Sequence, residues 1–111
     1  MGKELDYIQG RLIMFIKMQC LDTYDFVLPE ICSFHGFRYD KVNRSAIIST
    51  EHTHHDYIIP LDEEDYRKLE QAIWEKISQG QQMIELVGGD VLRVRRGEIR
   101  RAAPLKNLTV F

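Results

Sequence analysis

The hydrophobic and polar positions of the chain follow one clear helical period, between Pro60 and Gly80. At 100° per residue, four apolar side chains fall within about 80° of one another, which is typical of an amphipathic helix: Tyr66, Leu69, Ile73 and Ile77. Asp62 is a favoured residue at a helix start, and glycine is a favoured residue just past a helix end. The pattern therefore predicts a helix over about 62–79, with its apolar stripe packed on the core.

Short runs of β-branched and aromatic residues on both sides of this helix predict strands. The runs before the helix predict two antiparallel hairpins and cover residues 11–19, 24–28, 46–48 and 57–59. After the helix, residues 83–87 and 91–96 bracket Gly88-Gly89-Asp90, which favours a tight turn because glycine readily adopts positive φ. We therefore predict an α+β fold, in which one amphipathic helix packs a small antiparallel sheet of β-hairpins and a C-terminal hairpin follows.

Two of these hairpins share an internal spacing. When residues 84–99 are laid over residues 16–31, an offset of 68 residues pairs Ile16 with Ile84 and Asp22 with Asp90. If both hairpins turn about these aspartates, Ile16 faces Phe26 in the first, and Ile84 faces Val94 in the second. The spacing indicates a weak internal repeat, although alternating hairpins also resemble one another by chance.

The order of hairpin, second hairpin and acidic-capped helix extends over residues 16–77. Its pieces are Ile16-Lys17-Met18, the run from Asp25 to Ile31, Ala46-Ile47-Ile48, Tyr57-Ile58-Ile59 and the helix from Asp62. This order resembles the FlbD/SwrD family of small flagellar-motility proteins. The chain departs from the family in its turns and in the residues inserted around His35 to Arg44, and it continues past the helix. The resemblance implies topology rather than activity.

Length and composition narrow the class of protein. A chain of 111 residues with 44% hydrophobic and 29% charged residues has the size of a single domain, residues 1–111. Enzyme folds that need about 200 residues or more are excluded. No apolar run approaches the roughly 20 residues of a membrane helix, and acidic Glu4 and Asp6 stand where a signal peptide is apolar. We expect a cytoplasmic protein without a membrane partner.

The charge is distributed unevenly along the chain. Residues 1–90 carry 9 Lys and Arg against 16 Asp and Glu, whereas residues 91–111 carry 6 against 1. The candidate residues for binding an anion or an acidic partner are Arg93, Arg95, Arg96, Arg100 and Arg101. On a strand, Arg93 and Arg95 share a face and form a row that can hold carboxylates or phosphates. The alternative is that these arginines pair with Glu85, Glu98 or the acidic body of the protein itself.

Three histidines form a second candidate site. His52 and His54 project to the same side of an extended segment, and His35 can join them as a zinc ligand, as can Cys32. No Cys-x-x-Cys pair or second fixed cluster accompanies them. We therefore favour a solvated loop between two strands, without a cofactor, over a zinc site.

The two cysteines are predicted to be free and half-buried, because the hairpin between Cys20 and Cys32 separates them. No nucleophile motif, phosphate loop or dinucleotide fingerprint occurs in the chain. The leading hypothesis is a non-catalytic regulatory protein that binds a protein partner, with its arginine strand facing acidic groups. Exposed strand edges predict a homodimer as well. Zinc binding and nucleic-acid binding through the arginine strand are the alternatives, the latter disfavoured because the body is acidic.

Overall fold

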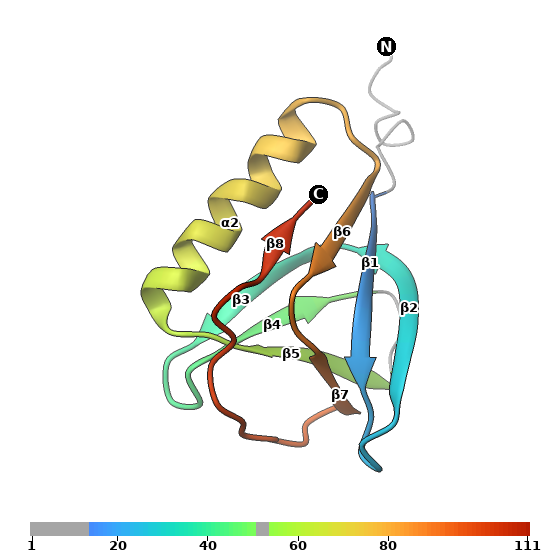
Figure 1. Ribbon diagram of the computed structural model, residues 1–111, viewed down its shortest axis with the longest axis vertical. Coiled ribbons are helices and arrows are strands. Elements are labelled where there is room, and N and C mark those ends of the chain that lie inside the picture. Colours follow the sequence, from blue (N-terminus) through green and yellow to red (C-terminus); the bar gives the residue numbers. More distant parts are fainter. Residues whose placement is uncertain (1–13, 51–53) are drawn as a thin grey trace.

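The computed structural model describes residues 14–50 and 54–111, and within these ranges the protein forms eight strands and one helix (Figure 1). The strands are β1 (Met14–Leu21), β2 (Val27–Phe34), β3 (Gly36–Asp40), β4 (Ser45–Ser49), β5 (His55–Pro60), β6 (Met83–Val87), β7 (Val91–Arg95) and β8 (Thr109–Val110). The helix α2 (Glu63–Ser78) lies between β5 and β6 in the chain. The predicted α+β class with one helix in the described part of the chain is confirmed.

Strand β1 has neighbours on both sides. It pairs antiparallel with β2, and it pairs in parallel with β6 and then with β7. The strand order is β3-β4-β5-β7-β1-β6-β8, with β2 beside β1, and the sheet curls into a half-barrel with β1 and β6 running across β3, β4 and β5 in the view of Figure 1. The prediction of a purely antiparallel sheet is therefore wrong, because β1 takes its parallel neighbours from a distant part of the chain.

The first hairpin joins β1 to β2, but in a different register from the predicted one. The chain remains in the turn until Phe26, because one carboxylate oxygen of Asp22 accepts the backbone N–H groups of Tyr24 and Phe26, each at 2.9 Å. Asp25 completes the turn with a φ of 65°. Ile16 consequently lies opposite Cys32 rather than Phe26.

Strands β3, β4 and β5 form an antiparallel meander. The predicted hairpin between the isoleucine-rich runs is confirmed, with Ile47 opposite Ile58. Strand β3 was not predicted, because glycine and charged residues interrupt its pattern. It brings Tyr39 against the helix, where the rings of Tyr39 and Tyr66 have centroids 5.1 Å apart.

The predicted C-terminal hairpin is wrong. Strands β6 and β7 do not pair with each other but lie in line along β1, where Ile84 is beside Ile16 and Val91 is beside Cys20. The offset between paired residues changes from 68 to 71 across this step, so residues 88–90 form a local bulge instead of a reversal. Because the second hairpin is absent, the predicted repeat of two hairpins does not form.

Helix α2 has the predicted position, with Asp62 as its N-cap residue and Gln79 as its C-cap residue. Tyr66, Leu69 and Ile73 are buried, so the predicted stripe packs on the core. The backbone N–H groups of Gly80 and Gln81 donate to the carbonyls of Ile77 and Lys76, a pairing that ends many helices. Gly80 permits this ending through its φ of 83°.

Residues 96–108 form a connection that we call the strap, which runs around the lower end of the molecule from β7 to β8 (Figure 1). The N–H of Leu105 donates to the carbonyl of Pro60 at 2.9 Å, and Lys106 lies 3.8 Å from the Asp62 carboxylate. The strap therefore continues beside the start of α2, and β8 then pairs with β6.

The main core lies inside the curled sheet and beneath α2. A smaller group of buried residues on the other face of β5 and β7 contains Ile58, Leu92 and Val94. Within residues 14–50 and 54–111, no helix is both long enough and apolar enough to cross a bilayer.

Candidate functional site

A polar hollow opens where the tip of the β1–β2 hairpin, the start of β5 and the end of β7 meet. Its volume is about 210 Å³, and we call it the mouth. The mouth is lined by Asp22, Thr23, Tyr24, His55, Arg93, Arg95 and Glu98. Two of the five predicted arginines therefore share one site, together with a histidine that was not predicted as part of it.

The alternation of β7 determines how these arginines enter the mouth. Leu92 and Val94 are buried in the smaller apolar group, so Arg93 and Arg95, which alternate with them, point to the other face of the strand. The antiparallel register with β5 puts Arg93 beside Tyr57 and Arg95 beside His55. The two guanidinium groups thus follow one another from the interior toward the rim.

Arg93 forms an ion pair with Glu30 of β2, and their side chains are 26% and 16% exposed. The other carboxylate oxygen of Glu30 accepts the hydroxyl of Tyr57 at 2.7 Å. Burial, and then the Glu30 carboxylate, raise the pKa of Tyr57, so its hydroxyl stays a donor. These bonds connect β2 to β5 and β7, with which β2 has no strand pairing in the described ranges. Glu30 was missed in the sequence, although it is the acidic position in an otherwise apolar alternation.

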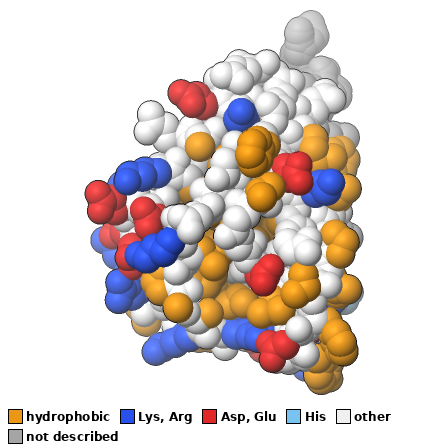
Figure 2. All heavy atoms as spheres, in the orientation of Figure 1, with side chains coloured by type: hydrophobic (Ala, Val, Ile, Leu, Met, Phe, Trp, Pro, Cys, Tyr) orange, Lys and Arg blue, Asp and Glu red, His pale blue; other side chains and the backbone are white. Residues whose placement is uncertain are grey.

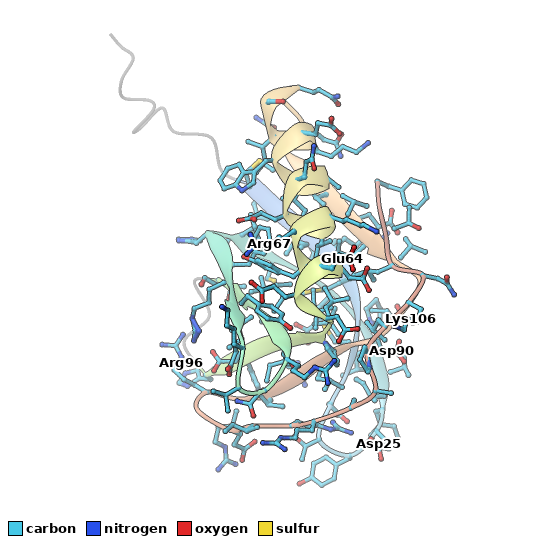
Figure 3. The ribbon with its side chains drawn as sticks, turned by 90° about the vertical axis from the view of Figure 1, so that its left-hand side faces the viewer. Asp25, Glu64, Arg67, Asp90, Arg96 and Lys106 are labelled. Carbon is cyan, nitrogen blue, oxygen red and sulfur yellow. The ribbon has the colours of Figure 1, made fainter. Side chains whose placement is uncertain are left out.

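Two further arginines contact acidic residues of the same chain. Arg100 donates to the backbone carbonyl of Asp22 at 2.6 Å and to the carboxylate of Asp25 at 2.5 Å. Figure 3 shows Asp25 at the lower end of the molecule, where the hairpin tip lies. Arg96 lies 3.9 Å from the Asp56 carboxylate. The strap is therefore attached to the rest of the molecule by its own basic side chains.

Arg101 makes a weaker contact, in which it donates to the amide oxygen of Asn43 at 3.3 Å. The exposed guanidinium of Arg95 has no carboxylate partner in the described part of the chain. Only its backbone is engaged, through hydrogen bonds with Glu98 at 3.3 and 2.9 Å. Of the two arginines that line the mouth, Arg95 is thus the one without a salt bridge to a described side chain.

Both acidic residues of the mouth accept hydrogen bonds from backbone N–H groups. Asp22 accepts two backbone N–H groups in the hairpin turn, and Glu98 accepts the backbone N–H of Arg95. Each of these bonds engages a single carboxylate oxygen, and neither residue is within salt-bridge distance of the Arg95 guanidinium in the described part of the chain.

Two of the three predicted histidines lie in the described part of the chain, and there they are not part of a metal site. His35 is exposed between β2 and β3, where its backbone N–H donates to Ser49 at 2.9 Å. His54 is exposed just before β5, and His52 lies outside the described residues. No group of three histidine, cysteine or acidic side chains in ranges 14–50 and 54–111 is arranged to hold a metal ion. Because the zinc prediction depends on His52, it stays a prediction.

The two cysteines are free, as predicted, but they are buried rather than half-buried. Cys20 lies opposite Leu28 and Cys32 opposite Ile16, so the two thiols are four residues apart along the β1–β2 pair. Burial, and then the Glu30 carboxylate, raise the pKa of Cys20 to about 12 and that of Cys32 to about 11. Both thiols are consequently protonated and unreactive at neutral pH.

Comparison with known proteins adds no family to this description. No family model matches the chain, and neither the curated proteins nor the solved structures contain a match to it.

Proposed function

We propose that the protein is a small, non-catalytic cytoplasmic regulator that binds a partner protein, and that the mouth receives an acidic segment of that partner. The observation that carries the proposal is the exposed guanidinium of Arg95, which has no carboxylate partner among the described residues. A partner carboxylate at this position forms the two parallel hydrogen bonds for which a guanidinium is shaped.

Exposed aromatic side chains beside the mouth support a protein as the ligand. Tyr24 is 80% exposed and Phe26 is 66% exposed, both at the hairpin tip. Ile99 of the strap is 65% exposed and precedes Arg100, which is bonded to this tip. Figure 2 shows hydrophobic side chains at the lower right, where the tip lies. Tyrosine, phenylalanine and arginine are enriched in protein interfaces, so an acidic segment with an apolar neighbour suits this surface.

The proposal separates the roles of Arg93 and Arg95. Arg93 supplies the floor of the mouth but is neutralised by Glu30, so its replacement disturbs the fold as well as the site. Arg95 is the better residue to change, because the described structure uses only its backbone.

A selection from a random peptide library on the wild-type protein tests this function. We expect peptides rich in Asp and Glu with an aromatic or aliphatic neighbour, and we expect Arg95→Glu to weaken their binding at least tenfold in a fluorescence polarisation titration. Arg101→Glu is the matched control, because it makes the same change of charge at an exposed arginine outside the mouth. It should change the affinity less than threefold.

Three results would contradict the proposal: selection of no peptide, selection of basic peptides, or an equal loss in the two variants. If the protein instead binds single-stranded DNA, with an affinity that falls steeply as salt is added and that needs Arg95, a nucleic-acid function replaces this one.

A further inference from the structure

The outward face of β2, β1 and β6 carries exposed apolar side chains around one ion pair. Lys17 of β1 and Glu85 of β6 lie 4.0 Å apart, and about half of each side chain is exposed. We call this surface the outer face, and its apolar members are Phe15, Ile31, Met83, Val87 and Phe111, which are 39–56% exposed. Figure 2 shows an acidic and a basic side chain next to each other with hydrophobic groups on either side, over β6 and β1.

The strand register arranges the outer face in rows. In one row Lys17 lies beside Ile31 on one side and beside Glu85 on the other. Phe111 extends this row, because it exchanges two backbone hydrogen bonds with Glu85, at 3.0 and 2.8 Å. The row therefore reads apolar, basic, acidic, apolar from β2 to the residue after β8.

The neighbouring row has Phe15 beside Met83. These side chains share the outward face because neighbours at the same register point to the same side of a sheet. Phe15 and Met83 are 39% and 41% exposed, although the inward residues of the same strands, such as Ile16 and Ile84, are completely buried.

We propose that a second copy of this chain covers the outer face, with a two-fold axis parallel to the strands and between β1 and β6. Such an axis exchanges the two halves of each row. Lys17 of one copy then faces Glu85 of the other, and Glu85 faces Lys17. Ile31 faces Phe111, and Phe15 faces Met83. The face is thus complementary to itself in both charge and apolar character, which is the requirement of a two-fold interface.

This arrangement is a face-to-face packing of two sheets, in which strand directions stay within about 30° of each other. At ordinary strand spacing, the outer face measures roughly 14 Å across its four strands and roughly 13 Å along them, between backbone centres. This area is below the roughly 800 Å² per partner of a standard stable interface. We therefore expect weak dimerisation that depends on protein concentration. It differs from the predicted dimer through strand edges, because no edge is paired.

Sedimentation velocity at protein concentrations of about 5 to 500 µM tests the dimer. Wild-type protein should shift from monomer to dimer over this range. Lys17→Glu places like charges opposite each other twice in the dimer and should weaken association at least tenfold, as should Glu85→Lys. The double variant K17E/E85K restores both opposite pairs, so its dissociation constant should return to within about threefold of the wild-type value.

The matched control is Arg67→Glu, which reverses one charge of an exposed pair on α2, away from the outer face. It should leave association unchanged, and circular dichroism should show the same fold for every variant. A wild type that is monomeric at all concentrations overturns the proposal. A dimer that all the variants form equally well also overturns it, because association then uses another surface. Neither result bears on peptide binding at the mouth, which Arg95→Glu tests separately.

Discussion

Glu30 performs two tasks with one carboxylate. It neutralises Arg93 and accepts the hydroxyl of Tyr57, so a side chain of β2 binds two strands that β2 does not pair with. The partners of such a polar residue cannot be predicted from sequence, because they lie 27 and 63 residues away in the chain. A usable signal was present nonetheless. Glu30 alternates with Leu28 and Cys32, and an acid at an inward position needs a partner.

The buried thiols give a prediction at the same scale. Unfolded cysteine titrates near 9.0, whereas the folded pKa values are about 12 for Cys20 and about 11 for Cys32. Below pH 9 both states keep their protons. Above it the unfolded chain loses them first, so the free energy of unfolding falls by up to about 1.4 kcal/mol per pH unit for each thiol.

Urea unfolding at pH 8, 9, 10 and 10.5 measures this loss of stability. The double variant Cys20→Ala with Cys32→Ala should show a shallower decline above pH 9, because both thiols are absent. Some decline remains, because burial also raises the pKa values of Tyr39, Tyr57 and Tyr66. Stability that is independent of pH up to 10.5, or equal slopes in the two proteins, would show that the thiols are not held protonated by the fold.

At the scale of elements, local signals succeeded and non-local pairing did not. Helix α2 was predictable because its period, its N-cap residue and its terminal glycine all lie within 20 residues of sequence. Strands β6 and β7 were located, but their pairing was wrong, since Gly88-Gly89-Asp90 is an equally good signal for a turn and for a bulge. The deciding contact with β1 comes from a strand that lies about 70 residues away.

Close contact with the strap explains why glycine is needed in the bulge, and the predicted tight turn did not include this contact. Gly88 has a φ of 114°, and a Cβ atom placed on it would lie 2.2 Å from the carbonyl oxygen of Asn107 in the strap. We predict that Gly88→Ala lowers the free energy of unfolding by more than about 2 kcal/mol, through both strain and displacement of the strap.

Gly97→Ala is the matched control for this change. Gly97 has a φ of 88° but has nothing within 4 Å of its added Cβ, so only the backbone strain of about 1 kcal/mol applies. Chemical denaturation compares the two variants. Equal losses would mean that the strap does not press on the bulge.

For the whole molecule, side chains join β2 to the paired strands β5 and β7, and the basic side chains of the strap attach it to the rest of the protein. The unequal charge of the chain predicted that residues 91–111 could meet an acidic body. It could not say which arginines do so, because the strap has no hydrophobic period and its partners Asp25 and Asp22 lie more than 70 residues earlier. Arg93 and Arg95 were correctly predicted to share one face of a strand. Only the three-dimensional arrangement shows that Arg93 has an ion-pair partner, Glu30, and that Arg95 has none among the described residues.

We propose that Arg93 and Arg100 maintain the fold through their ion pairs, whereas the Arg95 guanidinium is available to a partner. The measurement that tests it most directly is the free energy of unfolding of the single variants Arg93→Gln, Arg95→Gln and Arg100→Gln. We predict a loss of about 2 kcal/mol for Arg93→Gln, which leaves Glu30 without its ion pair, and about 1 kcal/mol for Arg100→Gln. Arg95→Gln should change stability by less than about 0.5 kcal/mol. A loss for Arg95→Gln as large as that for Arg93→Gln would contradict the division.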